Sequence, residues 1–312
     1  MTEEEALRAV AAREWGPLPD IGEPHIGVNR RTWRAGEHLW ITGMDSDRRD
    51  VLERENRLLE RLEVAFREAG LSFKVPHVAP SQSGVTVVEE GSWCFRATVH
   101  LAGKRPDGES ENTYVTAART LRSLHGALRA EAPELAVIPP FLSEVESAIE
   151  RCLGTRWRTV THDQSERDLV YTAANLLATR LSDLAELPCQ LTHGDWSAPN
   201  WLIDDSGAPT AVLDWQMATI APPIVDLSQV LSGVLMFSTV QIGRAAPAIT
   251  AAYGFDGDIE LLSAAMVAYW FRNYWLLRDE FERDPRVGGG IGGVERQPGR
   301  LRAVLAYTAL GH

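Results

Sequence analysis

The stretch Leu191-Thr-His-Gly-Asp-Trp-Ser-Ala-Pro-Asn-Trp-Leu-Ile203, followed by Ala211-Val-Leu-Asp-Trp215, decides how the rest of the chain is interpreted. It places a carboxylate, Asp195, and an amide, Asn200, five positions apart on one expected loop. A second carboxylate, Asp214, follows the amide by fourteen positions and stands at the end of an expected strand. The order, both spacings and the apolar flanks agree with one another, which argues against a chance combination of common residues.

These side chains suit the transfer of a phosphoryl group from a nucleotide to a hydroxyl. In such reactions one carboxylate orients the acceptor hydroxyl and takes its proton, while other oxygen ligands hold magnesium against the phosphates. Magnesium prefers oxygen ligands and keeps several waters, so one carboxylate and one amide are a natural contribution from the protein. We therefore predict Asp195 as the catalytic base, with Asn200 and Asp214 as metal ligands.

The residues around this set predict a strand, a turn and a second strand. Residues 201–203 are apolar, residues 204–207 have turn chemistry, and residues 210–213 are again typical of a strand. A β-hairpin of this kind would bring Asn200 and Asp214 together at one of its ends.

The same stretch resembles the aminoglycoside phosphotransferase family, which also includes choline-kinase-like enzymes. The resemblance implies an α+β, bilobal fold similar to that of protein kinases. A small nucleotide-binding lobe with the hinge would span residues 1–102, and a larger, mainly helical catalytic and substrate-binding lobe would span 103–312. It also implies Mg2+ as cofactor and ATP or GTP as co-substrate. Asp226 matches the family's structural aspartate under the catalytic loop. A role as the N-cap of a helix beginning near Leu227 is the alternative, and it is compatible with the first role.

Composition places the chain among ordinary soluble globular proteins. Its 312 residues suffice for two lobes, and it is 45% hydrophobic and 24% charged. No run approaches the roughly 18 apolar residues of a membrane span. The three cysteines are scattered and show neither metal-ligand spacing nor a disulfide framework. We therefore expect a cytoplasmic protein without a membrane partner.

The net charge of −12 argues against a nucleic-acid partner, because such proteins present a basic face. The charge is compatible with a cationic small substrate, and equally with an acidic protein that uses its charge only for solubility. The expected partners are a nucleotide and a small-molecule acceptor, and the chain is expected to be a monomer or a homodimer.

The order of the expected elements is that of a kinase-like fold. After a short helix over residues 2–15 come two strands within 25–42, a strong amphipathic helix over 46–69, and strands at 85–88 and 92–101. Further helices are expected beyond the lobe boundary, interrupted by the catalytic loop and hairpin, at 112–130, 141–153, 164–186, 224–236, 239–253, 257–283 and 294–310.

The resemblance also implies a nucleotide site in the small lobe. Gly27 and Asn29 match the nucleotide-positioning loop, although with a spacing one residue shorter than usual. Thr42 stands where the family carries the lysine or arginine that contacts the phosphates. Glu55 matches the helix glutamate that pairs with this cation, or it is a solvated surface charge.

Three explanations of the missing cation remain open. The first is a different strand register, the second is weakened or lost nucleotide binding, and the third is an arginine that reaches into the site, with Arg30, Arg31 and Arg34 as candidates. Lysine is nearly excluded because the 31 basic residues include only two lysines. In the expected hinge, main-chain groups of Val99 and Leu101 would contact the purine base. Because such contacts do not depend on the side chains, the sequence does not distinguish ATP from GTP as the co-substrate.

The acceptor site is less well marked. Trp196 lies within the catalytic loop and could form an aromatic wall against a sugar or nucleoside. Tyr269, Asn273 and Tyr274 lie close together on an aromatic helix that lines the acceptor pocket in the resembling family. The alternative for this helix is an aromatic stripe that faces the core.

The leading hypothesis is a magnesium-dependent kinase acting on a hydroxyl of an antibiotic or similar natural product. One alternative keeps the chemistry and changes the acceptor to a peptide in natural-product biosynthesis. Another, motivated by Thr42, is a nucleotide-binding pseudokinase.

Overall fold

The computed structural model describes residues 1–16, 21–26, 30–154, 163–283 and 294–309. The chain divides into two compact units. Unit 1 comprises Met1–Lys104 with Leu202–Gln216, and unit 2 comprises Arg105–Trp201 with Met217–His312. The expected hairpin therefore groups with the N-terminal residues. Among the described helices, none is both long and apolar enough to span a bilayer.

Unit 1 is built on an antiparallel sheet with the order β1-β2-β3-β6-β4, in which β5 also pairs with β6. Its elements are α1 (Glu3–Glu14), β1 (His25–Ile26), β2 (Arg31–Ala35), β3 (Leu39–Asp45), α2 (Arg49–Glu68), β4 (Val78–Ala79), β5 (Val88–Glu90) and β6 (Trp93–Val99). The strand expected at 85–88 instead begins at Val88, because Ser81 and Val85 close a turn through a 2.9 Å backbone hydrogen bond.

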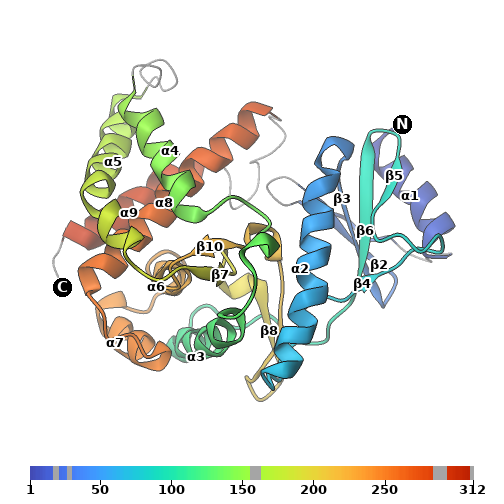
Figure 1. Ribbon diagram of the computed structural model, residues 1–312, viewed down its shortest axis with the longest axis horizontal. Helices are drawn as coiled ribbons and strands as arrows, with labels where there is room; N and C mark the ends of the chain where they lie inside the picture. Colours follow the sequence, from blue (N-terminus) through green and yellow to red (C-terminus); the bar gives the residue numbers. More distant parts are fainter. Residues whose placement is uncertain (17–20, 27–29, 155–162, 284–293, 310–312) are drawn as a thin grey trace. The chain divides into compact units, whose positions relative to one another are not determined.

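The helices α1 and α2 cover opposite faces of this sheet (Figure 1). Ile41 of β3 packs in one cluster with Leu7 of α1, whereas Met44 packs in another with Leu52 of α2. Successive strand side chains point to opposite faces. Thr42 therefore lies on the same face as Met44, under α2.

The hairpin consists of β8 (Trp201–Ile203) and β9 (Pro209–Val212). Its backbone bonds to two points of unit 1. Lys104 and Ile203 exchange two hydrogen bonds of 2.9 Å, and the N–H of Lys74 donates to the carbonyl of Thr210 (2.9 Å). These bonds explain why residues 202–216 group with unit 1.

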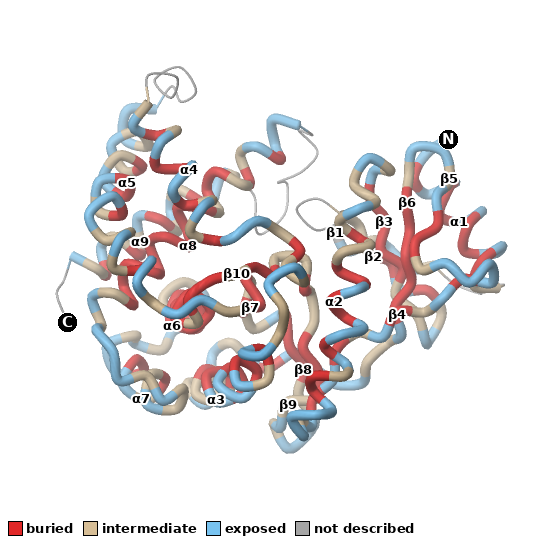
Figure 2. The backbone as a smooth tube through the Cα atoms, in the orientation of Figure 1, coloured by how far each residue is buried: buried red, intermediate tan, exposed pale blue. Residues whose placement is uncertain are grey.

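Unit 2 is mainly helical, as the sequence pattern predicts. Its elements are α3 (Glu111–Leu128), α4 (Phe141–Leu153), α5 (Gln164–Ala185), β7 (Gln190–Thr192), β10 (Thr219–Ala221), α6 (Ile224–Phe237), α7 (Ile242–Tyr253), α8 (Ile259–Arg283) and α9 (Gln297–Ala309). Much of α6 and α8 is buried (Figure 2). Short 3-10 turns occur in both units at Ser46–Arg48, Pro133–Leu135, Ala198–Asn200, Trp215–Met217 and Val294–Arg296. The strands β4, β7 and β10 were not predicted, because two or three residues are too short for a periodic pattern.

Candidate active site

The loop that follows β7 in unit 2 is fixed by one buried carboxylate. Asp226, in the first turn of α6, is fully buried. Its Oδ2 accepts a hydrogen bond from the backbone N–H of His193 (2.9 Å), and its Oδ1 accepts one from the N–H of Gly194 (2.9 Å). Buried backbone donors need partners, so this carboxylate determines the path of the loop.

Asp226 also connects the loop to α3, because Nε2 of His125 lies 3.0 Å from Asp226 Oδ2. Burial by itself raises the pKa of Asp226, but the hydrogen bond and charge of His125 and the interactions with His193 outweigh it. The pKa of Asp226 is therefore lowered. Since α6 begins at Ile224, Asp226 lies inside the helix. The alternative in which it caps a helix starting near Leu227 is wrong.

Glycine is required at position 194 for two reasons. Gly194 has φ +79°, in the left-handed region that side chains disfavour. A Cβ atom there would lie 1.9 Å from the carbonyl oxygen of Met217, which is a clash with backbone that cannot be relieved by a rotamer change. The close approach allows the chain to turn sharply before Asp195.

Both carboxylate oxygens of Asp195 are hydrogen-bonded. Oδ1 accepts from the hydroxyl of Tyr269 (2.8 Å), and Oδ2 accepts from Nδ2 of Asn200 (2.9 Å). The backbone N–H of Asp195 donates to Nδ1 of His193 (3.2 Å). Burial and then the negative charge of Asp195 hold the pKa of Tyr269 well above its usual value, so the phenol stays protonated and donates. The carboxylate is thus held in one orientation, and Asp195 as a residue is half-buried.

Asn200 ends the 3-10 turn after Asp195 and bonds back to it. Its Nδ2 donates to the backbone carbonyl of Asp195 (2.8 Å) as well as to the carboxylate. Both bonds use the amide nitrogen, so neither involves the amide oxygen. The oxygen is the atom of an amide that a hard cation binds. Asn200 therefore fits the chemistry of a magnesium ligand, and the structure brings it together with Asp195 in unit 2.

Asp214 follows β9 in unit 1 and has an unusual backbone conformation. Its φ of +59° makes it the one non-glycine residue with positive φ among the residues described. Such a conformation costs free energy and recurs at functional sites. The next residue, Trp215, is buried, and its Nε1 donates to the carbonyl of Val212 (3.3 Å). The Asp214 side chain keeps 31% exposure, so it has the chemistry and the access that a metal ligand needs.

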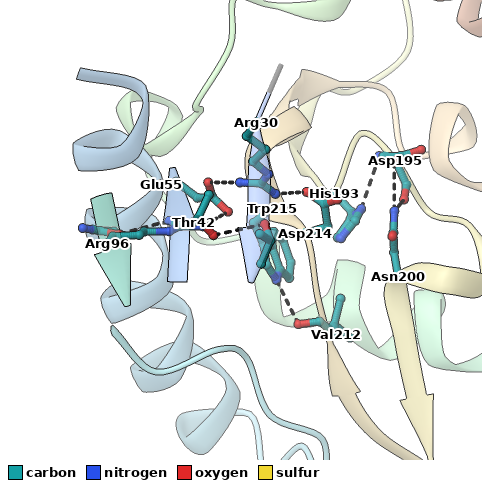
Figure 3. A network of polar contacts seen from close by, with 12 residues as sticks. Arg30, Thr42, Glu55, Arg96, His193, Asp195, Asn200, Val212, Asp214 and Trp215 are labelled. Carbon is teal, nitrogen blue, oxygen red and sulfur yellow. Dashed lines mark hydrogen bonds and ion pairs between the residues drawn. The ribbon is translucent and has the colours of Figure 1, made fainter. Parts of the chain in front are cut away.

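Glu55 belongs to a network of four charged side chains in unit 1 (Figure 3). Glu55 is 1% exposed, and its carboxylate pairs with Nη1 of Arg30 (2.9 Å) and Nη2 of Arg96 (2.7 Å). Arg30 also forms an ion pair with Asp214 through Nη2. Burial raises the pKa of Glu55, but the charges of the two arginines outweigh it and leave the pKa lowered. The alternative that Glu55 is a solvated surface charge is wrong.

Thr42 is buried on the α2 face of β3 and supplies no cation. In the strand register it stands opposite Arg96 of β6 on one side and Thr32 of β2 on the other. Arg96 was not recognised from the sequence. The signal that could have found it is a single charged residue inside the otherwise uncharged strand Trp93–Val99.

The structure describes only two of the four remaining residues that were predicted to bind the nucleotide. Gly27 and Asn29 lie outside the described residues. Val99 ends β6, and its N–H donates to the carbonyl of His77 (2.8 Å), so this amide is already used within unit 1. Leu101 follows β6 and is half-buried. The hinge role of Val99 and Leu101 stays a prediction.

The residues predicted to contact the acceptor lie mostly in the core of unit 2. Trp196 is 1% exposed and stacks on Trp201 with ring centroids 6.4 Å apart, so it packs the interior instead of forming an open wall. Tyr274 is equally buried and bonds to Glu166. Asn273 is half-buried. Tyr269 contacts Asp195, as described above, and this contact was not anticipated.

Comparisons with known proteins agree on the family. A sequence model of the phosphotransferase enzyme family, APH, matches residues 44–262. No match was found among curated proteins. The predicted resemblance to this family is thereby confirmed.

Solved structures share the fold along nearly the whole chain. The GDP and kanamycin complex of APH(2")-IIia is 16% identical, with a TM-score of 0.70 and coverage of 97% of this chain and 98% of that one. The ADP and streptomycin complex of APH(3'')-Id from Streptomyces rimosus is 17% identical, with a TM-score of 0.65 and coverage of 87% and 99%. The complex of amicoumacin kinase hAmiN with AMP-PNP, Ca2+ and Ami is 14% identical, with a TM-score of 0.69 and coverage of 96% and 93%.

These similarities confirm the expected protein-kinase-like fold. The matched segment contains α2, the catalytic loop, the hairpin and α6. The chain is therefore an enzyme that belongs to the phosphotransferase enzyme family.

Proposed function

We propose that this enzyme transfers the γ-phosphoryl group of ATP or GTP to a hydroxyl of a small molecule, in a reaction that depends on magnesium. The observation that carries the proposal is the setting of Asp195. Its loop is anchored by Asp226, and its two oxygens are fixed by Tyr269 and Asn200. A carboxylate held in this way is suited to orient an acceptor hydroxyl.

In the proposed reaction Asp195 accepts the proton of the acceptor hydroxyl as its oxygen bonds to the γ-phosphorus. The bond between the γ-phosphorus and the bridging oxygen breaks, and a nucleoside diphosphate leaves. Magnesium supplies charge neutralisation at the phosphates when it is bound. Asn200 and Asp214 are the proposed ligands, because one offers an amide oxygen and the other a partly exposed carboxylate.

For the acceptor we propose an antibiotic or a related natural product. The neighbours described above are complexes with kanamycin, with streptomycin and of an amicoumacin kinase, and they support this class. An acidic chain of net charge −12 also favours a cationic acceptor by long-range attraction.

A peptide acceptor gains no support from the described structure. An open groove along α8 would favour it, but fifteen residues of this helix are buried, and it packs against α4, α5, α6 and α9. We therefore retain the small-molecule proposal alone.

The experiment is a transfer assay on a panel of hydroxyl-bearing antibiotics, with ATP and GTP as separate donors. Product is identified by mass spectrometry as the acceptor carrying one added phosphoryl group. Asp195→Asn serves as the inactive control. Phosphorylation of a panel member by the wild type but not by the variant supports the proposal. Equal product from both proteins would refute the assignment of Asp195.

A further inference from the structure

The nucleotide half of the proposed site lacks a cation on the strand that would carry it. Thr42 occupies the α2 face of β3, and it is buried and uncharged. Neither lysine of the chain belongs to β3. Lys104 pairs with Asp205 at an exposed position, and Lys74 lies in the segment between α2 and β4.

Two arginines contact Glu55 instead, and their surroundings differ. Arg96 is enclosed, because it bonds to Asn56 Oδ1 (3.0 Å) as well as to Glu55 and is 4% exposed. It serves as a fixed brace between β6 and α2. Arg30 joins the buried Glu55 to Asp214, whose side chain is 31% exposed. Of the two guanidinium groups, Arg30 is therefore the one that meets a solvent-accessible carboxylate.

The charges of this network balance in the structure, with two guanidinium groups against two carboxylates. Magnesium at Asp214 would bring a second cation to a carboxylate that Arg30 already neutralises. The guanidinium would then be available for another anion. Its planar fork of five N–H donors matches phosphate oxygens well, and the donors that bind Glu55 can stay in place.

We propose that Arg30 supplies, from the segment just before β2, the phosphate-binding cation that β3 lacks, and that it exchanges Asp214 for nucleotide phosphates when magnesium–nucleotide binds. The proposal rests on the proposed function. It selects one of the three arginines that the sequence leaves open, and it removes the reason for regarding the chain as a pseudokinase. Arg30 is a positioning residue for Asp214 before binding and a phosphate contact after it.

The first test measures phosphate-dependent affinity by calorimetry. ATP and GTP with magnesium are compared with adenosine and guanosine, which have the bases but no phosphates. Arg30→Ala is expected to weaken the binding of the preferred nucleotide by about 10- to 100-fold, because charge-assisted hydrogen bonds to the phosphates are lost. The binding of the nucleoside should stay unchanged. Arg30→Lys, which keeps the charge, should retain part of the affinity. Arg34→Ala, an exposed arginine of the same strand region, should match the wild type.

The second test uses Mn2+ alone, with binding followed by electron paramagnetic resonance. Because Arg30 competes with the metal for Asp214, Arg30→Ala should bind Mn2+ more tightly than the wild type. A purely structural role for Arg30 would weaken both nucleotide and metal binding. The two opposite changes therefore distinguish the proposal from a folding defect.

Three results would decide against this account. Wild-type nucleotide affinity in Arg30→Ala, or an equal loss for nucleotides and nucleosides, overturns the role of Arg30 and leaves the proposed function standing. Unchanged or weaker Mn2+ binding in Arg30→Ala overturns the exchange. Absence of any nucleotide binding by the wild type instead overturns the proposed function.

Discussion

The hydroxyl of Tyr269 donates a hydrogen bond of 2.8 Å to Oδ1 of Asp195, across 74 positions of sequence. The phenol is buried on α8, and its raised pKa keeps it a donor. A helix in the core of unit 2 therefore sets the orientation of the carboxylate that we propose as the base.

Tyr269→Phe removes this hydrogen bond with little change in shape. Hydrogen bonds to charged groups contribute about 1.5–3 kcal/mol, so kcat should fall about tenfold or more while the KM for nucleotide stays unchanged. Steady-state kinetics with the nucleotide varied provide the measurement. Tyr114→Phe is the control, because this buried tyrosine of α3 uses its hydroxyl for bonds to the backbone carbonyls of Gly108 and Gly233, which are uncharged groups. An equal loss of kcat in both variants would contradict the role of Tyr269.

Asp195→Asn preserves the size of the side chain and removes the proton acceptor. General-base catalysis contributes about 10²- to 10⁴-fold, so single-turnover transfer should slow by this factor. Nucleotide affinity should stay within about twofold, because the proposed phosphate contacts lie elsewhere. Rapid-quench kinetics and calorimetry on the same preparation separate the two quantities. A variant that transfers phosphate at the wild-type rate would exclude Asp195 as the base.

Gly194→Ala should destabilise the catalytic loop more than left-handed backbone strain alone explains. Position 194 combines φ +79° with a clash at 1.9 Å, whereas Gly207 has φ +86° and open space around it. Gly207→Ala should therefore lower the free energy of unfolding by about 1 kcal/mol, and Gly194→Ala by about 3 kcal/mol or more. Urea unfolding measures both. Equal losses in the two variants would contradict the prediction that the clash with Met217 adds to the destabilisation.

Asp226→Asn should remove a stabilisation that depends on pH. The lowered pKa of Asp226 means that its stabilisation is fully present above the unfolded pKa of about 4 and is lost as pH falls through the folded pKa. At about pH 5 to 7 the free energy of unfolding of Asp226→Asn should be about 2–3 kcal/mol lower than that of the wild type. This difference should shrink below about pH 4. Unfolding at each pH provides the measurement. A gap that widens in acid would contradict the assignment, and Asp205→Asn, at a fully exposed site, is the neutral control.

The sequence predicted what is encoded locally. Apolar periodicity located most helices of unit 2 to within a few residues, and the fixed spacing of Asp195, Asn200 and Asp214 identified the family. Turn chemistry at residues 204–207 located the hairpin.

Contacts between distant positions could not be predicted in this way. Arg30 meets Glu55 across 25 positions and Asp214 across 184, and no local pattern connects these residues. The burial of Trp196 was missed for the same reason, because its place in a loop indicated exposure while the packing of His193 and Trp201 around it decided otherwise. Strand pairing explains Arg96, since its position opposite Thr42 follows only from the register of β3 and β6.

The most direct measurement is a calorimetric titration of ATP and GTP, with magnesium and with EDTA, on the wild type and on Asp214→Asn. Asparagine keeps the size of the side chain and tolerates the left-handed backbone at this position. We predict that the wild type binds at least one nucleotide more tightly with magnesium, and that the variant loses this difference. Magnesium-independent binding, or an undiminished magnesium effect in Asp214→Asn, would contradict the central claim that this carboxylate holds the metal for phosphoryl transfer.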